Sequence, residues 1–240
     1  MRAKINTFMF DLDGTLLPMD VDKFIELYFH EMGDKFKDLI HPKTLVEYVW
    51  TATREMIRNL EYRTNEEVFM EKFSALVQGD IHEYQRRFDE FYDTSFSKVK
   101  NAVSHSPIVQ ESIGILKDKG YQLVIATNPL FPRKAIYERI KWAGLDPKDF
   151  MYISSYEQNH YCKPHLEFFQ EVLKEIGKKP EECMMVGNDV EEDMVAGRMG
   201  IQTFLITDYM IRSSSQEIKA TYQGTYEDFR NFVLQLETIR

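Results

Sequence analysis

The fold is decided by the stretch Ile5-Asn-Thr-Phe-Met-Phe-Asp-Leu-Asp-Gly-Thr-Leu16. Its apolar run, Phe8–Phe10, is too short for a helix and predicts a buried strand. Because side chains alternate along an extended chain, Asp11 and Asp13 leave the strand on the same side, at its carboxyl end. Open α/β sheets bind their ligands at this end, so the two carboxylates predict a functional site there.

A turn after the strand would explain only part of this stretch. Asp13-Gly14 marks a turn in many folds, and Gly14 lets the backbone turn sharply. A turn requires neither the second carboxylate at Asp11 nor the Thr15-Leu16 pair that closes it. The whole pattern, Asp-x-Asp-Gly-Thr-Leu after an apolar strand, resembles the first motif of the haloacid dehalogenase-like hydrolase superfamily. Most members of that superfamily use the first Asp as a nucleophile toward phosphate.

The composition limits the classes to which the protein can belong. With 240 residues, 43% apolar and 29% charged, it is typical of a soluble protein with one large domain or a core and a smaller module. It has no long apolar segment and no signal-peptide pattern, and its two cysteines, Cys162 and Cys183, fit a reducing compartment. We therefore expect a cytoplasmic location. The net charge of −9 argues against nucleic acid as a partner but allows a small phosphorylated substrate.

Between Leu16 and Ser97 the pattern is helical. Apolar residues recur at helical spacing in four segments, which begin at Asp20, Pro42, the Thr64–Glu67 capping box and Asp80. A crossover between neighbouring strands normally needs a single helix. We therefore interpret residues 17–97 as an inserted helical cap domain and residues 1–16 and 98–240 as the core.

From Ser106 onward helices and strands alternate, which is typical of a mostly parallel sheet with helices on both faces. Strands are predicted at Tyr121–Ala126, Met151–Ser154, Cys183–Gly187 and Gln202–Ile206. Helices are predicted from Pro107 and at Arg133–Trp142, Pro164–Ile176, Glu191–Met199 and Thr225–Leu236. A mobile loop is predicted at Arg212–Gln216. The predicted fold class is α/β, a Rossmann-like mostly parallel sheet core with an inserted all-helical cap.

Two further strand ends carry groups suited to phosphate. Thr127 and Asn128 alone predict a turn before Pro129, but a hydroxyl beside exposed backbone amides also suits phosphate oxygens. Lys163, which precedes Pro164, would ordinarily be a solvated surface charge. Both positions resemble motifs of the superfamily: a Ser or Thr that binds the phosphate, and a Lys that neutralises the nucleophile and the transferring phosphoryl group.

The fourth strand end is Met185–Gly197, where an apolar strand runs into a glycine and then a cluster of acids. Asp189 and Glu192 could form a capping box, which does not require Asp193. Asp193 would lie one turn further on the same face, and a carboxylate pair beside Asp11 calls for a cation. By resemblance to the superfamily, Asp189 matches the usual metal ligand. Asp193 either binds the metal itself or supports a residue that does. Asn188 occupies a position that is often acidic.

The four motifs occur in the superfamily's order, and the chain is identified as a member of its phosphatase type with a helical cap. The resemblance implies that Asp11 attacks phosphorus and that Asp13 protonates the leaving oxygen and then activates water. It assigns catalysis to Asp11, Asp13, Thr127 and Lys163. It assigns phosphate binding to Leu12, Gly14, Thr127, Asn128 and Lys163. It assigns Mg²⁺ to Asp11, the Asp13 backbone carbonyl, Asp189 and Asp193.

The predicted function is a magnesium-dependent phosphatase that hydrolyses a small phosphorylated metabolite through an aspartyl-phosphate intermediate. Asp13 argues against a haloacid dehalogenase, which needs no leaving-group acid and no metal. Two alternatives remain open: a sugar phosphomutase with the same four motifs, and a non-catalytic protein that binds a phosphate ligand. We expect a monomer or weak homodimer with no nucleic acid and no membrane as partner.

Overall fold

The computed structural model describes residues 5–213, 215 and 217–239. Within them lies a six-stranded sheet in the order β3-β2-β1-β4-β5-β6, and all neighbouring strands are parallel. In chain order the strands are β1 (Thr7–Phe10), β2 (Gln122–Ile125), β3 (Tyr152–Ile153), β4 (Cys183–Gly187), β5 (Gln202–Ile206) and β6 (Tyr222–Gly224). The predicted α/β fold with a parallel sheet is confirmed, and β1 lies between β2 and β4.

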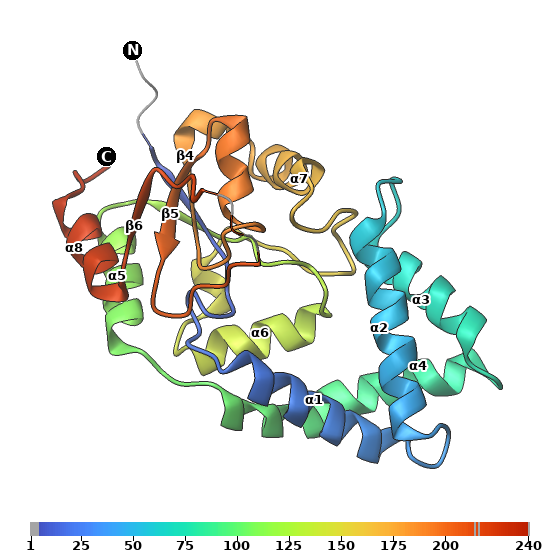
Figure 1. The fold of residues 1–240 in the computed structure, drawn as a ribbon. Coiled ribbons are helices and arrows are strands. Elements are labelled where there is room, and N and C mark those ends of the chain that lie inside the picture. Colours follow the sequence, from blue (N-terminus) through green and yellow to red (C-terminus); the bar gives the residue numbers. More distant parts are fainter. Residues whose placement is uncertain (1–4, 214, 216, 240) are drawn as a thin grey trace.

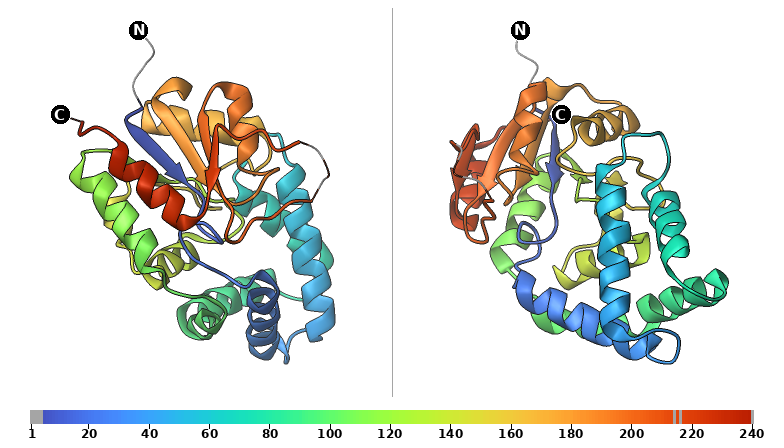
Figure 2. Two further views of the ribbon diagram at one scale, coloured as in Figure 1. Left: turned by 60° about the vertical axis from the view of Figure 1, so that its left-hand side comes forward. Right: turned by 45° about the vertical axis from the view of Figure 1, so that its right-hand side comes forward.

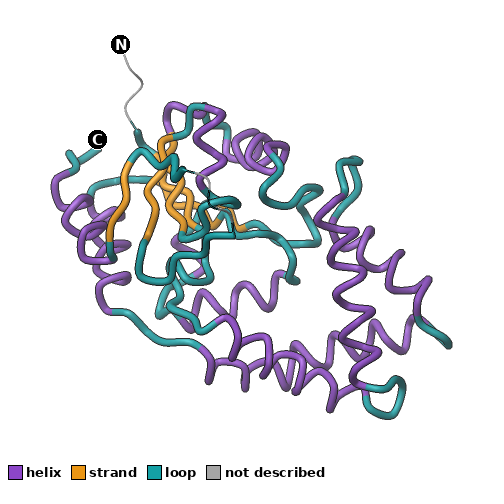
Figure 3. The backbone as a smooth tube through the Cα atoms, in the orientation of Figure 1, coloured by secondary structure: helices purple, strands orange, loops and turns teal. Residues whose placement is uncertain are grey.

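Helices cover both faces of the sheet (Figures 1 and 3). On one face, apolar side chains from α5 (Pro107–Asp118), α6 (Arg133–Trp142) and α8 (Tyr226–Gln235) pack with Phe8 and Phe10. On the other face, α7 (Leu166–Ile176) and the 3₁₀ helix η5 (Met194–Met199) pack with Met9 and Met185. Two short 3₁₀ turns, η3 (Pro147–Asp149) and η4 (Pro180–Glu182), precede β3 and β4. Because β1 is buried on both faces, its carboxyl end is held firmly at the centre of the sheet.

The inserted block is helical, and its helices lie beside the sheet (Figure 2). It contains α1 (Val21–Phe36), α2 (Pro42–Arg58), α3 (Asn65–Leu76) and α4 (Ile81–Glu90). A π-helical turn, η1 (Phe91–Ser95), and a 3₁₀ helix, η2 (Phe96–Ala102), then lead back toward the core. Asp20 caps α1, and Thr64 forms a capping box with Glu67 at the start of α3. The helical cap and its four α-helices agree with the sequence, while its boundaries at residues 17 and 97 stay a prediction.

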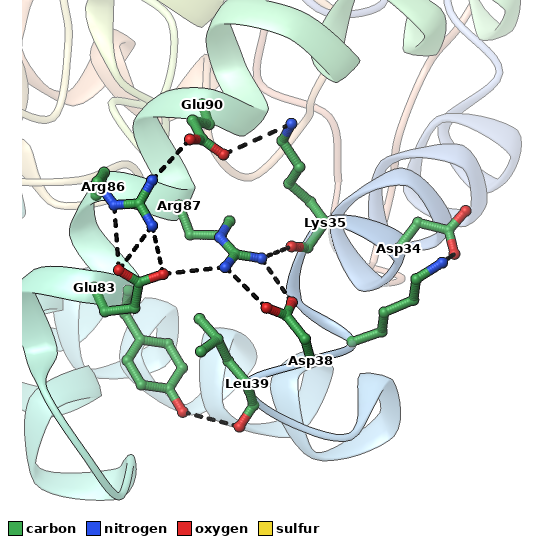
Figure 4. Close-up of polar contacts among 10 residues, drawn as sticks. Asp34, Lys35, Asp38, Leu39, Glu83, Arg86, Arg87 and Glu90 are labelled. Carbon is green, nitrogen blue, oxygen red and sulfur yellow. Dashed lines mark hydrogen bonds and ion pairs between the residues drawn. The ribbon is translucent and has the colours of Figure 1, made fainter.

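A network of ion pairs joins α4 to the end of α1 (Figure 4). Arg87 donates to the Lys35 carbonyl and to Asp38, both at 2.6 Å, and to Glu83 at 3.0 Å. Surface pairs contribute little individually, but Phe88 also packs against Phe36 with ring centroids 4.8 Å apart. Together these contacts fix the angle between the two helices.

The cap is attached to the core at several places, among them the chain junction and the start of α3. Where the chain enters and leaves it, Met19 and Val103 form an isolated antiparallel bridge. At the start of α3, Asn65 N–H donates to the Asn159 carbonyl at 2.8 Å, and its side-chain amide donates to the Pro129 carbonyl at 3.3 Å. We call the second attachment the α3 docking contact.

Three parts of the fold differ from the sequence prediction or lie beyond it. The predicted helix Glu191–Met199 is a run of turns followed by η5, because Asp193 is drawn into a hydrogen bond with Asp189 N–H and two glycines follow. Strand β6 was not predicted, since its side chains are mostly exposed and show no apolar alternation. The predicted mobile loop Arg212–Gln216 falls partly outside the described residues.

No helix in the described part of the chain is both long enough and apolar enough to cross a membrane.

Candidate active site

The end of β1 forms a tight turn that presents the two predicted carboxylates. The Leu12 carbonyl accepts hydrogen bonds from Leu16 N–H at 2.9 Å and Leu17 N–H at 2.8 Å. Gly14 has a φ of +80°, and a Cβ there would lie only 2.3 Å from the Asn188 amide nitrogen. Only glycine fits this position, so the turn brings Asp13 back beside Asp11.

Lys163 links motifs that are far apart in the sequence. Its Nζ donates to Asp11 Oδ1 at 3.0 Å and to Asp193 Oδ1 at 2.6 Å, and its side chain is 1% exposed. Burial alone lowers the pKa of this ammonium group, but Asp11 and Asp193 outweigh burial and raise the pKa above its usual value. Lys163 is therefore a buried, permanently charged cation and not a surface lysine.

Thr127 and Asn128 follow β2 beside this ion pair. Ser154 Oγ donates to the Thr127 carbonyl at 2.6 Å, which orients the backbone of the strand end. Asn128 Oδ1 accepts from Lys163 N–H at 3.2 Å, and Asn128 Nδ2 donates to Glu192 Oε2 at 2.9 Å. Neither Thr127 Oγ1 nor Asn128 N–H has a partner in the described residues, so both remain free for an anion.

Asp189 and Asp193, which follow β4, differ in how many of their carboxylate oxygens are hydrogen-bonded. Both Asp193 oxygens are engaged, one by Lys163 and the other by Asp189 N–H at 3.0 Å. Asp189 Oδ1 accepts from Glu191 N–H and Glu192 N–H, each at 2.8 Å. The geometry thus favours Asp193 as a group that positions Lys163 and Asp189, and leaves the second oxygen of Asp189 open.

Asn188 holds the turn after β1 against the segment after β5. Its Oδ1 accepts from Thr15 Oγ1 at 2.9 Å, and its Nδ2 donates to the Tyr209 carbonyl at 2.7 Å. A carboxylate could not make the second bond, which explains why an amide suits this position here.

The free oxygens fit a magnesium ion. Asp11 Oδ2 and Asp189 Oδ2 accept no hydrogen bond from the described residues, so both can bind a cation. Burial raises the pKa of Asp189. Across residues 5–213, 215 and 217–239, no three His, Cys, Asp or Glu side chains already surround one position. Mg²⁺ does not require such a cluster, because one or two carboxylates with substrate oxygens and water commonly hold it.

Arg139 was not predicted from the sequence, although it pairs with Asp13. It extends from α6, is 1% exposed, and its guanidinium carbon lies 4.3 Å from the centre of the Phe131 ring. Burial raises the pKa of Asp13, and Arg139 offsets this only in part. The available signal was an arginine on the apolar face of α6, next to Ala135 and Ile136.

Glu192 is a second residue whose place at the site was not predicted. Burial raises its pKa to about 7, and Lys163 only partly opposes the shift. In the sequence it was assigned to helix capping, but its side chain accepts from Asn128.

The site opens into a cavity of about 470 Å³ between the cap and the core. Its walls include Asp11, Asp13, Thr127, Asn128, Asp189 and Asp193. The structure therefore brings the four predicted strand ends together. The predicted phosphate-binding residues Leu12, Gly14 and Lys163 do not line the cavity, and Lys163 lies behind Asp11 and Asp193.

The family model for haloacid dehalogenase-like hydrolases matches residues 5–229, which include all four strand ends. The chain belongs to this family.

Several known proteins resemble this haloacid dehalogenase-like hydrolase at low sequence identity. It is 26% identical to pyrophosphatase PpaX of Bacillus cereus over 195 residues, which is 81% of this chain and 79% of the relative. A HAD phosphatase from Thermococcus onnurineus superposes with a TM-score of 0.61 at 20% identity, covering 98% of this chain and 100% of the other. The HAD-hydrolase YfnB from Bacillus subtilis, described as bound to magnesium, gives 0.60 at 19% identity, with coverage of 96% and 99%. At these identities the structural likeness establishes the fold alone.

Proposed function

We propose that this hydrolase is a magnesium-dependent phosphatase that hydrolyses a small phosphate monoester through an aspartyl-phosphate on Asp11. The observation that carries the proposal is the buried ion pair between Lys163 and Asp11, beside the free Thr127 hydroxyl. A phosphoryl group next to Asp11 would meet one carboxylate to attack it and hydrogen-bond donors to stabilise its oxygens. The PpaX relatives, which are hydrolases acting on a phosphate group, support the same reaction class.

In the first half of the reaction, Asp11 attacks phosphorus and the bond from phosphorus to the leaving oxygen breaks. Asp13 gives that oxygen a proton, and its raised pKa suits this role. Asp13 then takes a proton from the water that attacks the aspartyl-phosphate, which releases phosphate and regenerates Asp11. Throughout, Thr127 offsets the negative charge on the phosphoryl oxygens, and Lys163 offsets the charge of Asp11 from behind it.

Asp11, the Asp13 backbone carbonyl and Asp189 would hold the magnesium ion, with Asp193 positioning Asp189. The ion would draw charge from the phosphoryl oxygens and reduce their repulsion from Asp11.

Removal of magnesium is expected to abolish turnover of p-nitrophenyl phosphate, because the acids beside Asp11 would then repel the substrate. Added Mg²⁺ should restore the rate, and Asp189→Ala should raise the Mg²⁺ concentration needed for half-maximal rate. The measurement is the release of inorganic phosphate by chelator-treated protein. A full rate after chelation would contradict the assignment of the ion.

Replacement of Asp13 by Asn is expected to reduce kcat/KM more for an alkyl phosphate than for p-nitrophenyl phosphate, by at least about tenfold. An alkoxide needs a proton to leave, whereas p-nitrophenolate does not. The quantity is kcat/KM because it reports the steps up to the aspartyl-phosphate and excludes its later hydrolysis. Equal losses for both esters would give Asp13 a structural or electrostatic role.

A further inference from the structure

Aromatic side chains of the cap line the cavity together with aliphatic ones. The aromatic residues are Phe24, Tyr28, Phe29, Trp50, Phe69, Phe88 and Tyr92. The hydroxyls of Tyr28 and Tyr92 hydrogen-bond to each other at 2.8 Å, so only one of the two O–H groups remains free to donate to a ligand. Such walls favour an apolar leaving group, because burying an unpaired charge among them is costly.

In the described part of the chain, the charged groups that line the cap side of the cavity are acidic. Among the described residues that line the cavity there is no lysine or arginine, and the cap contributes Glu66 and Asp89. Lys134 lies 3.4 Å from Asp89 and partly neutralises it. Glu66 has no ion pair in the described part of the chain; Tyr156 Oη donates to it at 3.5 Å. Burial, and then Glu157, raise the pKa of Glu66, as expected of a carboxylate without a cation.

Glu66 is held at the cavity by the α3 docking contact. Its N–H donates to the Tyr156 carbonyl at 2.9 Å, and the neighbouring Asn65 is fully buried against the core. The Thr64 capping box fixes the same turn. The carboxylate is therefore positioned by backbone contacts and not by a flexible loop.

We propose, given the phosphatase activity proposed above, that the cavity takes esters whose leaving group is bulky, mainly apolar and free of negative charge, and that Glu66 determines this specificity. A carboxylate or second phosphate on the leaving group meets Glu66 with no cation to offset the repulsion. A positive charge at the far end of the leaving group is attracted by Glu66 and by the faces of the aromatic rings. The substrate class therefore differs from the diphosphate named for the PpaX relatives.

The test compares 4-methylbenzyl, 4-carboxybenzyl and 4-(aminomethyl)benzyl phosphate, with pyrophosphate as a compact anion. The three esters are similar in size, and a methylene group insulates the leaving oxygen from the substituent. For the wild-type protein we expect kcat/KM for the methyl ester to exceed that for the carboxy ester by at least about tenfold, with the amino ester equal to or better than the methyl ester.

Glu66→Gln should reduce the ratio of kcat/KM for the amino ester to kcat/KM for the carboxy ester by about tenfold. Glu26→Gln is the matched control, because Glu26 is an exposed acid of the cap that does not line the cavity. The control should leave the ratio unchanged. An equal shift in both variants would show that the general charge of the cap, and not Glu66, sets the preference.

The same ligands are also titrated by calorimetry into Asp11→Asn, so that binding is measured without turnover. Hydrolysis of the carboxy ester or pyrophosphate as fast as the methyl ester would overturn the inference and leave the phosphatase intact. Binding in the expected order without hydrolysis by the wild-type protein would overturn the phosphatase and support the ligand class. Binding of all ligands with equal affinity would overturn the ligand class.

Discussion

The Asp11→Asn variant is expected to lose turnover of p-nitrophenyl phosphate by at least about 10⁴-fold and to remain folded. The amide has the shape of the carboxylate but cannot attack phosphorus. Carboxylates outnumber cations around Asp11, so loss of one negative charge should not lower the melting temperature. The measurements are phosphate release and thermal unfolding of the purified variant.

Asp118→Asn is the matched control for this substitution, since Asp118 is exposed at the end of α5 and does not line the cavity. It should keep the wild-type rate. Activity of Asp11→Asn near that of the wild type would assign the nucleophile elsewhere, and a large fall in melting temperature would make Asp11 a structural residue.

The Lys163→Met variant is expected to lose both stability and turnover. Removal of one partner from a buried ion pair leaves uncompensated charge, and the free energy of unfolding should fall by about 3–5 kcal/mol. Turnover should fall by about 10²–10³-fold, because the cation that positions Asp11 and offsets its charge is lost. Urea unfolding and kcat/KM measure the two effects.

A double variant separates the two roles of Lys163. Lys163→Met with Asp193→Asn removes one of the unpaired carboxylates and should recover part of the stability but none of the activity. Lys174→Met, at an exposed position of α7, should change the free energy of unfolding by less than about 0.5 kcal/mol. A Lys163→Met variant as stable as this control would contradict the buried pairing.

The sequence predicted those elements whose signals are local. The bounds of β4, β5 and α6 coincide with the predicted ranges, because each is a strongly patterned segment bounded by turn residues. Strand β6 could not be predicted in the same way, since its pairing with β5 and not its own pattern makes it a strand. The π-helical turn Phe91–Ser95 likewise has no local signal separate from that of α4.

The same difference between local signals and long-range contacts decides which residues of the candidate site could be predicted. Asp11, Thr127, Lys163 and Asp189 were predicted because each follows a recognisable strand and resembles a family motif. The contact between Arg139 and Asp13 joins residues 126 positions apart, and only the packing of α6 against the cap and β1 creates it. The charge of the cavity wall depends on Glu66 in the same way, because α3 must dock on the core to bring it there.

A cap that is attached to the core both at the chain junction and at the start of α3 cannot open by rotation about a single hinge. To widen the cavity on this side, the hydrogen bonds made by Asn65 and Glu66 with the core must break, and each contributes about 1 kcal/mol to the closed arrangement. The hydrogen bonds that Asn59 and His165 make between the end of α2 and the core hold the same side. Glu66 lies in the segment that has to move. Any widening of the cavity on this side would therefore displace the same turn of α3 that we propose discriminates between leaving groups.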